Sequence, residues 1–188
     1  MLIRSKPSLA VLSLATLVSL PTGAVSAQEA SPPLRPSACV TEQEVQEFIR
    51  RVNVLRERGG ICPNTRFATA PPLRTEPRLM QSSMLFAVEL AENGKLDHFS
   101  IRSGRLRDRL RTVAYRFAYA AENLAAGQES IDELLEAWLP SIRHCQNLFN
   151  PRHRDVGLAC APSDGPYSRM WVMQVATDQV QNLEASQP

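Results

Sequence analysis

The apolar residues of this chain recur with a helical period through most of its length and with the pattern of strands near its end. The first helix is predicted over residues 41–58, where Glu44 follows Thr41 at three positions and the pattern stops at Gly59. Thr and Glu at that spacing form a capping box, and glycine commonly ends helices. The apolar face between these signals consists of Val45, Phe48, Ile49, Val52 and Leu55.

Three more helices are predicted further along the chain. Residues 61–75 are rich in proline and indicate a loop or a short extended run. A second helix follows over 76–93, and a shorter, basic helix lies within 95–115. The last helix spans 130–139 and begins with Ser130 as its cap.

Two strands are predicted near the end of the chain, over 155–161 and 167–176. The Asp-Gly pair at 164–165 between them is a signal for a hairpin turn. Helices followed by a terminal antiparallel hairpin indicate an α+β fold. We expect Trp138 to lie in the core on a helix and Trp171 to lie there on a strand.

Residues 1–27 have the pattern of a secretory signal peptide. A basic start precedes an apolar run, and small residues follow up to Ala27. The apolar run is too short and wrongly flanked for a transmembrane helix. We therefore expect a secreted or periplasmic protein with a flexible leader over 28–38, one folded domain over 39–180 and a flexible tail over 181–188.

The charge of the mature chain is balanced. The whole sequence has 21 basic and 19 acidic residues, and residues 1–27 contain two of the basic ones and none of the acidic ones, which leaves 19 of each. This balance argues against a nucleic-acid partner and against a strongly anionic membrane. We expect a monomer. One basic run is expected to be a solvated face, although it could meet anionic cell-wall chains: Arg102, Arg105, Arg107, Arg109 and Arg111.

All four cysteines lie in the part that is expected to be exported, and an even number in an oxidising compartment predicts disulfides. The close cysteine pairs of a zinc site are absent from the sequence. The first predicted helix separates Cys39 from Cys62 by roughly 27 Å, whereas bridged Cα atoms lie within about 7 Å of each other. This disfavours a bridge between these two. Two connectivities remain, and one of them joins Cys62 to Cys145 and Cys39 to Cys160.

Five short motifs occur in order along the chain: DHFS (97–100), AAENLAAGQ (120–128), WLPSIRHCQNLFNP (138–151), VGLA (156–159) and MWVMQV (170–175). Together they resemble the bacterial branch of the CAP superfamily, which includes cysteine-rich secretory proteins, antigen 5 and plant pathogenesis-related proteins. The resemblance implies a three-layer α-β-α sandwich with a shallow cavity lined by His and Glu side chains. It also implies a bridge between Cys62 and Cys145.

The resemblance implies which side chains form that cavity. The first His of the family corresponds to His98 and the first Glu to Glu122. The position of the second Glu holds Ser141, and the strand that usually carries the second His has none. His144 can supply the second imidazole, and Glu136 could supply the second carboxylate only by facing inward, although we expect it on the surface.

Several of these positions also have local interpretations. Because Pro140 ends the last predicted helix, we expect His144 and Cys145 in a loop. His153 is expected to be a solvated loop residue. The secondary candidates for the cavity are Asn123, Glu136, Ser141 and Gln174.

Two imidazoles and a carboxylate match zinc ligands in type, but no His-Glu-x-x-His spacing orders them. The sequence is compatible with a weak divalent-cation site at His98, Glu122 and His144 and indicates no obligatory cofactor. No Gly-x-Ser-x-Gly motif indicates a serine hydrolase. We favour a non-enzymatic protein that binds a lipid or cell-wall ligand. The alternative is a peptidase-like hydrolase that uses Glu122 and a His as acid and base.

Overall fold

The computed structural model describes residues 38–180. The predicted signal peptide, the leader up to residue 37 and the tail over 181–188 lie outside the described residues. Within residues 38–180, no helix combines the length and the apolar character needed to cross a membrane.

The two long helices form where the sequence predicts them. Helix α1 spans Glu42–Arg58, and the Thr41 hydroxyl accepts a hydrogen bond from the Glu44 amide at 3.2 Å. The Glu44 carboxylate accepts one in return from the Thr41 amide at 2.7 Å, which completes the predicted capping box. Helix α2 spans Pro77–Asn93 and ends at Gly94, whose φ of 61° costs glycine little.

Three short helices follow, and one of them corrects a prediction. Helix α3 spans Leu106–Thr112, α4 spans Ile131–Trp138 and α5 spans Ile142–Phe149. The sequence predicted a loop after Pro140, but the chain begins α5 two residues later. Helix α5 is stable because it buries one apolar face, formed by Cys145, Leu148 and Phe149.

The central sheet has four strands in the order β3-β5-β6-β4. Strand β3 pairs parallel to β5, whereas β5 and β4 both pair antiparallel to β6. The predicted hairpin of β5 and β6 is confirmed. A separate antiparallel pair joins β1 (Gly60–Cys62) to β2 (Thr65–Phe67). The strands of the central sheet are β3 (Arg74–Thr75), β4 (Phe117–Ala126), β5 (Asp155–Pro162) and β6 (Arg169–Asp178).

Strand β4 was not predicted as a strand. Five of its ten residues are alanine, and it contains no β-branched residue, so its local preference for a strand is weak. Its long ladder with β6, from Phe117 to Ala126, is what holds it in the sheet. Strand β4 forms an edge of the sheet, and it carries Glu122.

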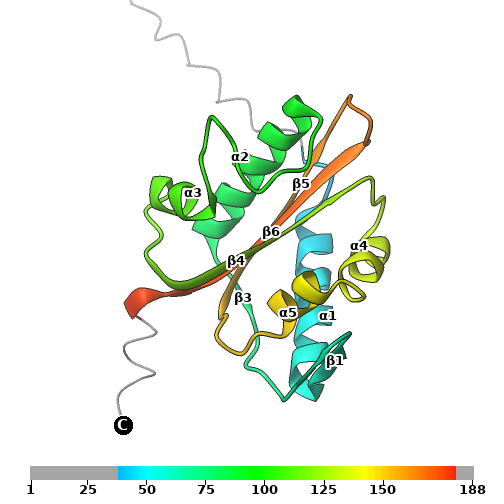
Figure 1. The fold of residues 1–188 in the computed structure, drawn as a ribbon, viewed down its shortest axis with the longest axis vertical. Helices are drawn as coiled ribbons and strands as arrows, with labels where there is room; N and C mark the ends of the chain where they lie inside the picture. Colours follow the sequence, from blue (N-terminus) through cyan, green and yellow to red (C-terminus); the bar gives the residue numbers. More distant parts are fainter. Residues whose placement is uncertain (1–37, 181–188) are drawn as a thin grey trace, which may run out of the picture. The chain divides into compact units, whose positions relative to one another are not determined.

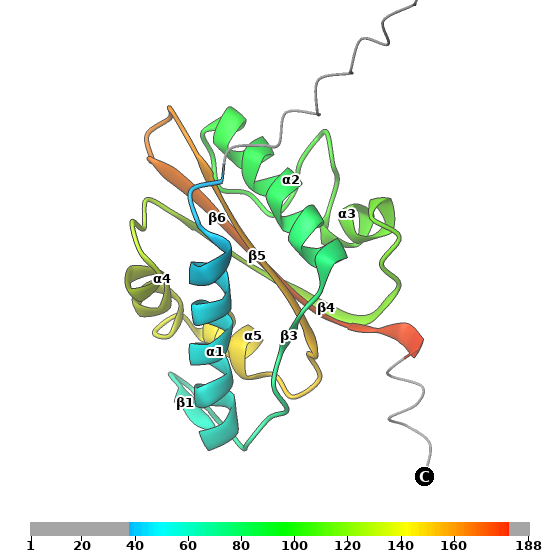
Figure 2. The same cartoon turned by 180° about the vertical axis from the view of Figure 1, so that it is seen from behind.

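Helices cover both faces of the sheet, so the predicted three-layer α-β-α sandwich is confirmed (Figures 1 and 2). Helices α2 and α3 lie against one face, and α1, α4 and α5 lie against the other. Alternate residues of β6 therefore enter different cores. Toward α2 and α3 point Met170, Val172 and Ala176, and toward the other helices point Trp171, Met173 and Val175.

The larger core confirms the predicted positions of the two tryptophans. Trp138 and Trp171 are buried in the core that also contains apolar residues of α1, α4 and α5. The Trp138 ring meets the Phe48 ring edge to face, with centroids 5.9 Å apart. Aromatic pairs in this geometry add to the stability that burial alone provides.

Two disulfides close the fold and agree with the predicted pairing. Cys62 is bridged to Cys145, with Cα atoms 5.7 Å apart, and Cys39 is bridged to Cys160, with Cα atoms 5.1 Å apart. The first bridge joins β1, just after α1, to α5. The second joins the segment before α1 to β5. Both bridges tie the α1 side of the sandwich to elements distant in sequence.

Candidate functional site

Glu122 lies in the middle of β4 on the face that α2 and α3 cover. It is paired in register with Gln174 of β6, whose side-chain amide donates to Glu122 Oε2 at 3.0 Å. Only 3% of the Glu122 side chain is exposed. A buried carboxylate is costly unless a cation and hydrogen-bond donors satisfy it, so its remaining partners decide what this site is.

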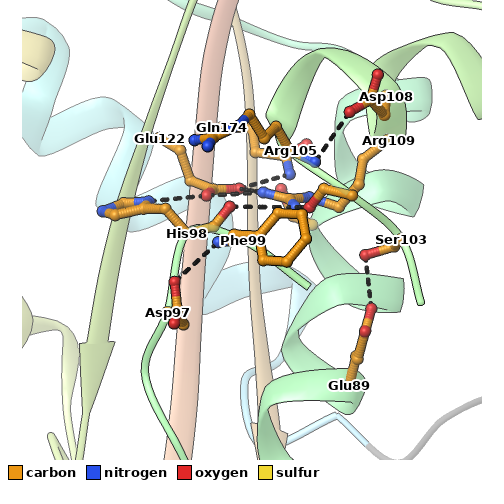
Figure 3. Close-up of polar contacts among 12 residues, drawn as sticks. Glu89, Asp97, His98, Phe99, Ser103, Arg105, Asp108, Arg109, Glu122 and Gln174 are labelled. Atoms are coloured by element: carbon orange, nitrogen blue, oxygen red, sulfur yellow. Dashed lines mark hydrogen bonds and ion pairs between the residues drawn. The ribbon is translucent and has the colours of Figure 1, made fainter. Parts of the chain in front are cut away.

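The cation that satisfies Glu122 is Arg109 of α3. Its Nη2 donates to Oε1 at 2.8 Å and to Oε2 at 2.7 Å, and the arginine side chain is 4% exposed (Figure 3). The other terminal nitrogen, Nη1, donates to the Gly104 carbonyl at 2.8 Å. The guanidinium stacks over the Phe86 ring of α2, with its carbon 3.5 Å from the ring centroid.

This pair corrects the prediction that the whole basic run is solvated. Arg109 is buried, and only the other four arginines of the run are exposed. One signal was available in the sequence. Arg109 lies three residues after Leu106 and beside Leu110, so a helix places it on the apolar face, and Glu122 in an apolar strand needed a cation.

His98 reaches the same carboxylate from the loop between α2 and α3. Its Nδ1 lies 3.0 Å from Glu122 Oε1, while 61% of its side chain is exposed. Because an ionised carboxylate only accepts hydrogen bonds, Nδ1 carries the proton of this bond. In the neutral ring Nε2 then keeps a free lone pair, and the ring extends away from the buried pair (Figure 3).

His144 lies on α5, on the opposite face of the sheet from Glu122. Burial is the main cause that lowers the pKa of His144, and the charge of nearby His98 adds to it. Among residues 38–180, no hydrogen bond joins the His144 ring to Glu122. The structure therefore brings His98 and Glu122 into contact, whereas the His144 ring forms no hydrogen bond with either side chain among residues 38–180.

The secondary candidates separate into different roles. Gln174 binds Glu122, as described above. Asn123 is buried on the other face of β4, where its amide donates to the His144 carbonyl at 3.1 Å and its oxygen accepts from Asn147 at 2.8 Å. Asn123 therefore holds α5 against β4. Glu136 is exposed and lines a groove between α1 and α4, and Ser141 is the N-cap residue of α5.

The arrangement of charges differs from the metal site that the sequence was compatible with. Among residues 38–180, no three His, Cys, Asp or Glu side chains are grouped so that they could hold a metal ion. Arg109 contacts both oxygens of Glu122 and occupies the position that a cation would take beside this carboxylate. The built-in cation of the site is thus a guanidinium.

A small cavity of about 60 Å³ lies behind Arg109, between α2 and α3. Three buried polar atoms that belong to its lining have no hydrogen-bond partner among the described residues: Ser82 Oγ, Glu89 Oε1 and Arg109 Nε. The other oxygen of Glu89 accepts a hydrogen bond from Ser103 at 2.6 Å. Glu89 belongs to none of the motifs identified in the sequence, but the helical pattern of α2 places it on the buried face of that helix.

His153 also corrects a prediction. It was expected in solvent, but it is 2% exposed, and both ring nitrogens lack a hydrogen-bond partner in the described part of the chain. Burial, with the charges of Arg56 and Arg154 as lesser causes, lowers its pKa to about 4. Buried Arg56 ties the chain around His153 to neighbouring segments. Its guanidinium donates to the carbonyls of Pro71, Leu148, Asn150 and His153.

With the fold and the site described, comparison with known proteins assigns the family. Residues 49–175 match the model of the cysteine-rich secretory protein (CAP) family. This chain belongs to the CAP family. The CAP match covers all elements from α1 to β6 apart from the two ends, and it includes His98, Arg109 and Glu122.

Individual CAP relatives are distant in sequence. The uncharacterized protein YkwD of Bacillus subtilis is 25% identical over 127 residues, which are 68% of this chain and 46% of that relative. This chain therefore spans less than half the length of that protein.

Two solved structures have the same fold. An extracellular protein of Bacillus anthracis that contains an SCP domain aligns with a TM-score of 0.59 and 23% identity, over 71% of this chain and 40% of that one. An outer surface protein of Borrelia burgdorferi aligns with a TM-score of 0.64 and 17% identity, over 77% of this chain and 100% of that one. At these identities the likeness concerns the fold alone.

Proposed function

We propose that this CAP-domain protein acts outside the cytoplasm as a non-enzymatic binding protein, and that the exposed edge of His98 contacts its lipid or cell-wall ligand. Two disulfides suit an oxidising compartment. Two of the relatives are named as an extracellular protein and an outer surface protein, which supports the same location for this chain.

The observation that carries the proposal is that both side-chain oxygens of Glu122 are already hydrogen-bonded within the protein. Its two oxygens accept hydrogen bonds from Arg109, Gln174 and His98. Hydrogen bonds from the protein therefore occupy both oxygens of this carboxylate, which leaves neither free to take a proton from a substrate. Glu122 thus serves to fix His98, and the exposed imidazole can recognise a ligand by donating or accepting a hydrogen bond.

One observation favours the hydrolase as a second candidate. A carboxylate that accepts from His Nδ1 orients the ring, and the free Nε2 could then act as a general base. This reaction also needs a nucleophile or a water molecule held beside Nε2. The described residues provide the His98–Glu122 part of such a site, and the binding function requires nothing more.

A combined test separates the two functions. Purified protein is titrated with a short-chain phosphatidylglycerol and with soluble cell-wall fragments, and turnover of peptide and ester substrates is measured in parallel. We expect one probe to bind, His98→Ala to weaken that binding about tenfold, or about 1.4 kcal/mol, and no turnover. Turnover that Glu122→Gln abolishes would establish the hydrolase instead. Binding that His98→Ala leaves unchanged would remove His98 from the function.

A further inference from the structure

The loop that carries His98 displays apolar side chains to solvent. Ile101 is 98% exposed at the tip of this loop, and Phe99 is 48% exposed on the same loop. Leu85 of α2 is also largely exposed and lines the small cavity together with Ser103, so it lies beside the loop tip. Large apolar side chains grouped in this way indicate an interaction surface.

The exposure of Ile101 is a property of an ordered turn. Ser100 and Gly104 exchange two backbone hydrogen bonds at 3.0 and 2.9 Å across the tip. The Ser100 hydroxyl accepts from the amides of Arg102 and Ser103 at 2.9 and 3.3 Å. These four hydrogen bonds order the turn, and the turn leaves the Ile101 side chain exposed to water.

Basic side chains surround these apolar groups. Residues 92–116 carry six exposed basic side chains against Glu92, Asp97 and Asp108, which is an excess of three positive charges, and Arg102 is paired with Glu92 at 2.7 Å. The guanidinium of Arg105 lies 5.7 Å from the centroid of the Phe99 ring. Although the mature chain has equal numbers of basic and acidic residues, this part of its surface is basic. The six basic residues are Lys95, Arg102, Arg105, Arg107, Arg111 and Arg116.

We infer that this surface docks onto an anionic lipid bilayer. We call it the Ile101 patch and define it by Leu85, Phe99, Ile101, Arg102 and Arg105. The apolar side chains would enter the interface, and the arginines would meet the anionic headgroups. A soluble polyanion would attract the arginines but gives no reason to display Ile101, so the lipid surface is the occupant that matches both features.

Docking at this patch would bring the His98 site to the membrane surface. Arg109 holds Glu122 through Nη2 and the Gly104 carbonyl of the tip through Nη1. Figure 3 shows Phe99 and Arg105 beside the buried pair. The docking surface goes beyond the proposed function and does not depend on it, because His98 is not among the five residues of the patch.

Vesicle sedimentation tests the inference. The purified full chain is mixed with vesicles of phosphatidylcholine alone or of phosphatidylcholine and phosphatidylglycerol in equal parts. We expect sedimentation with the anionic vesicles only, and less of it in high salt because the arginines are screened. Ile101→Asp should weaken the binding about tenfold, since one buried isoleucine contributes about that factor.

Ile61 offers a matched control, because it is an exposed isoleucine on β1, which lies far from α3 in both views (Figures 1 and 2). Ile61→Asp should bind vesicles as the wild type does. Equal losses in Ile61→Asp and Ile101→Asp, or no sedimentation of the wild type, would overturn the inference. So would wild-type binding by Ile101→Asp together with a loss in the double variant Arg102→Gln/Arg105→Gln, because charge alone would then explain it.

The same assay separates this inference from the proposed function. His98→Ala should sediment with anionic vesicles as the wild type does, because the exposed His98 ring does not belong to the Ile101 patch. Loss of ligand titration in His98→Ala with normal sedimentation supports both proposals. Normal sedimentation without any His98-dependent ligand binding would sustain the docking surface and reject the proposed function.

Discussion

A single nitrogen of Arg109, Nη2, donates to both carboxylate oxygens of Glu122, and both side chains are buried beneath α2 and α3. This ion pair joins α3 to the edge strand β4 and fixes the loop that carries His98. The site is therefore built around an internal charge pair whose exposed part is the His98 ring.

Removing one partner of this pair should destabilise the fold more than removing both. Arg109→Met leaves the Glu122 carboxylate buried without a cation, which we expect to cost about 3–5 kcal/mol of unfolding free energy. The double variant Arg109→Met/Glu122→Gln should recover part of that loss, because the uncompensated charge is gone. Urea unfolding followed by circular dichroism measures both.

The matched control for this prediction is Arg107→Met on the same helix. The Arg107 side chain is exposed, so its loss should change the unfolding free energy by no more than about 0.5 kcal/mol. If Arg109→Met and Arg107→Met were equally stable, the buried pair would have no structural role.

Zinc should leave the melting temperature of the protein unchanged. The sequence was compatible with a weak divalent-cation site at His98, Glu122 and His144, but Arg109 contacts both oxygens of Glu122. A metal would have to displace the guanidinium and leave it buried without a counter-ion, which costs several kcal/mol. Melts at neutral pH with and without zinc check this. A zinc-induced shift that His98→Ala removes would restore the metal site.

The disulfide between Cys62 and Cys145 should contribute strongly to stability. It closes a loop with a sequence separation of 83 residues, and the chain-entropy argument gives about 4.5 kcal/mol for a loop of that length. The variant Cys62→Ala/Cys145→Ala should melt at a lower temperature, as calorimetry under non-reducing conditions would measure. If the variant melted at the wild-type temperature, the bridge would not constrain the unfolded chain.

The sequence predicted those parts of the fold whose causes are local. Thr41 and Glu44 are three residues apart, and the Asp-Gly pair at 164–165 lies within one turn, so the helix start and the hairpin could be recognised without tertiary information. Strand β4 was not predicted because its alanine-rich sequence has no strand preference of its own. Its partner β6 lies more than forty residues away. Only pairing in the assembled sheet stabilises β4 as a strand.

The candidate site was predictable to the same degree. The motifs identified His98 and Glu122, which are in contact, whereas Arg109 was assigned to solvent. Arg109 and Glu122 are separated by 13 residues and a turn of the chain, so no periodic pattern joins them. A buried carboxylate predicts that a cation exists, but six basic residues, Arg109 among them, lie between Ser100 and β4, and their distance along the chain from Glu122 does not single out Arg109.

The burial of His153 leads to a prediction about acid stability. Its pKa in the folded protein is lowered to about 4, chiefly by burial, and the unfolded value is about 6.5. Between these values the unfolded chain binds more protons than the folded one. The contribution of neutral His153 is therefore fully present above about pH 6.5 and is lost as the pH falls toward 4, by about 3 kcal/mol in total.

The variant His153→Phe isolates this effect, because its ring has a similar size and cannot bind a proton. Other groups titrate in the same range, among them His144, whose pKa is also lowered. The difference in unfolding free energy between wild type and variant removes their contribution. Urea unfolding at intervals from pH 7 to pH 4 should show the wild type losing stability faster than His153→Phe. Parallel curves would mean that His153 is hydrated or exposed in solution.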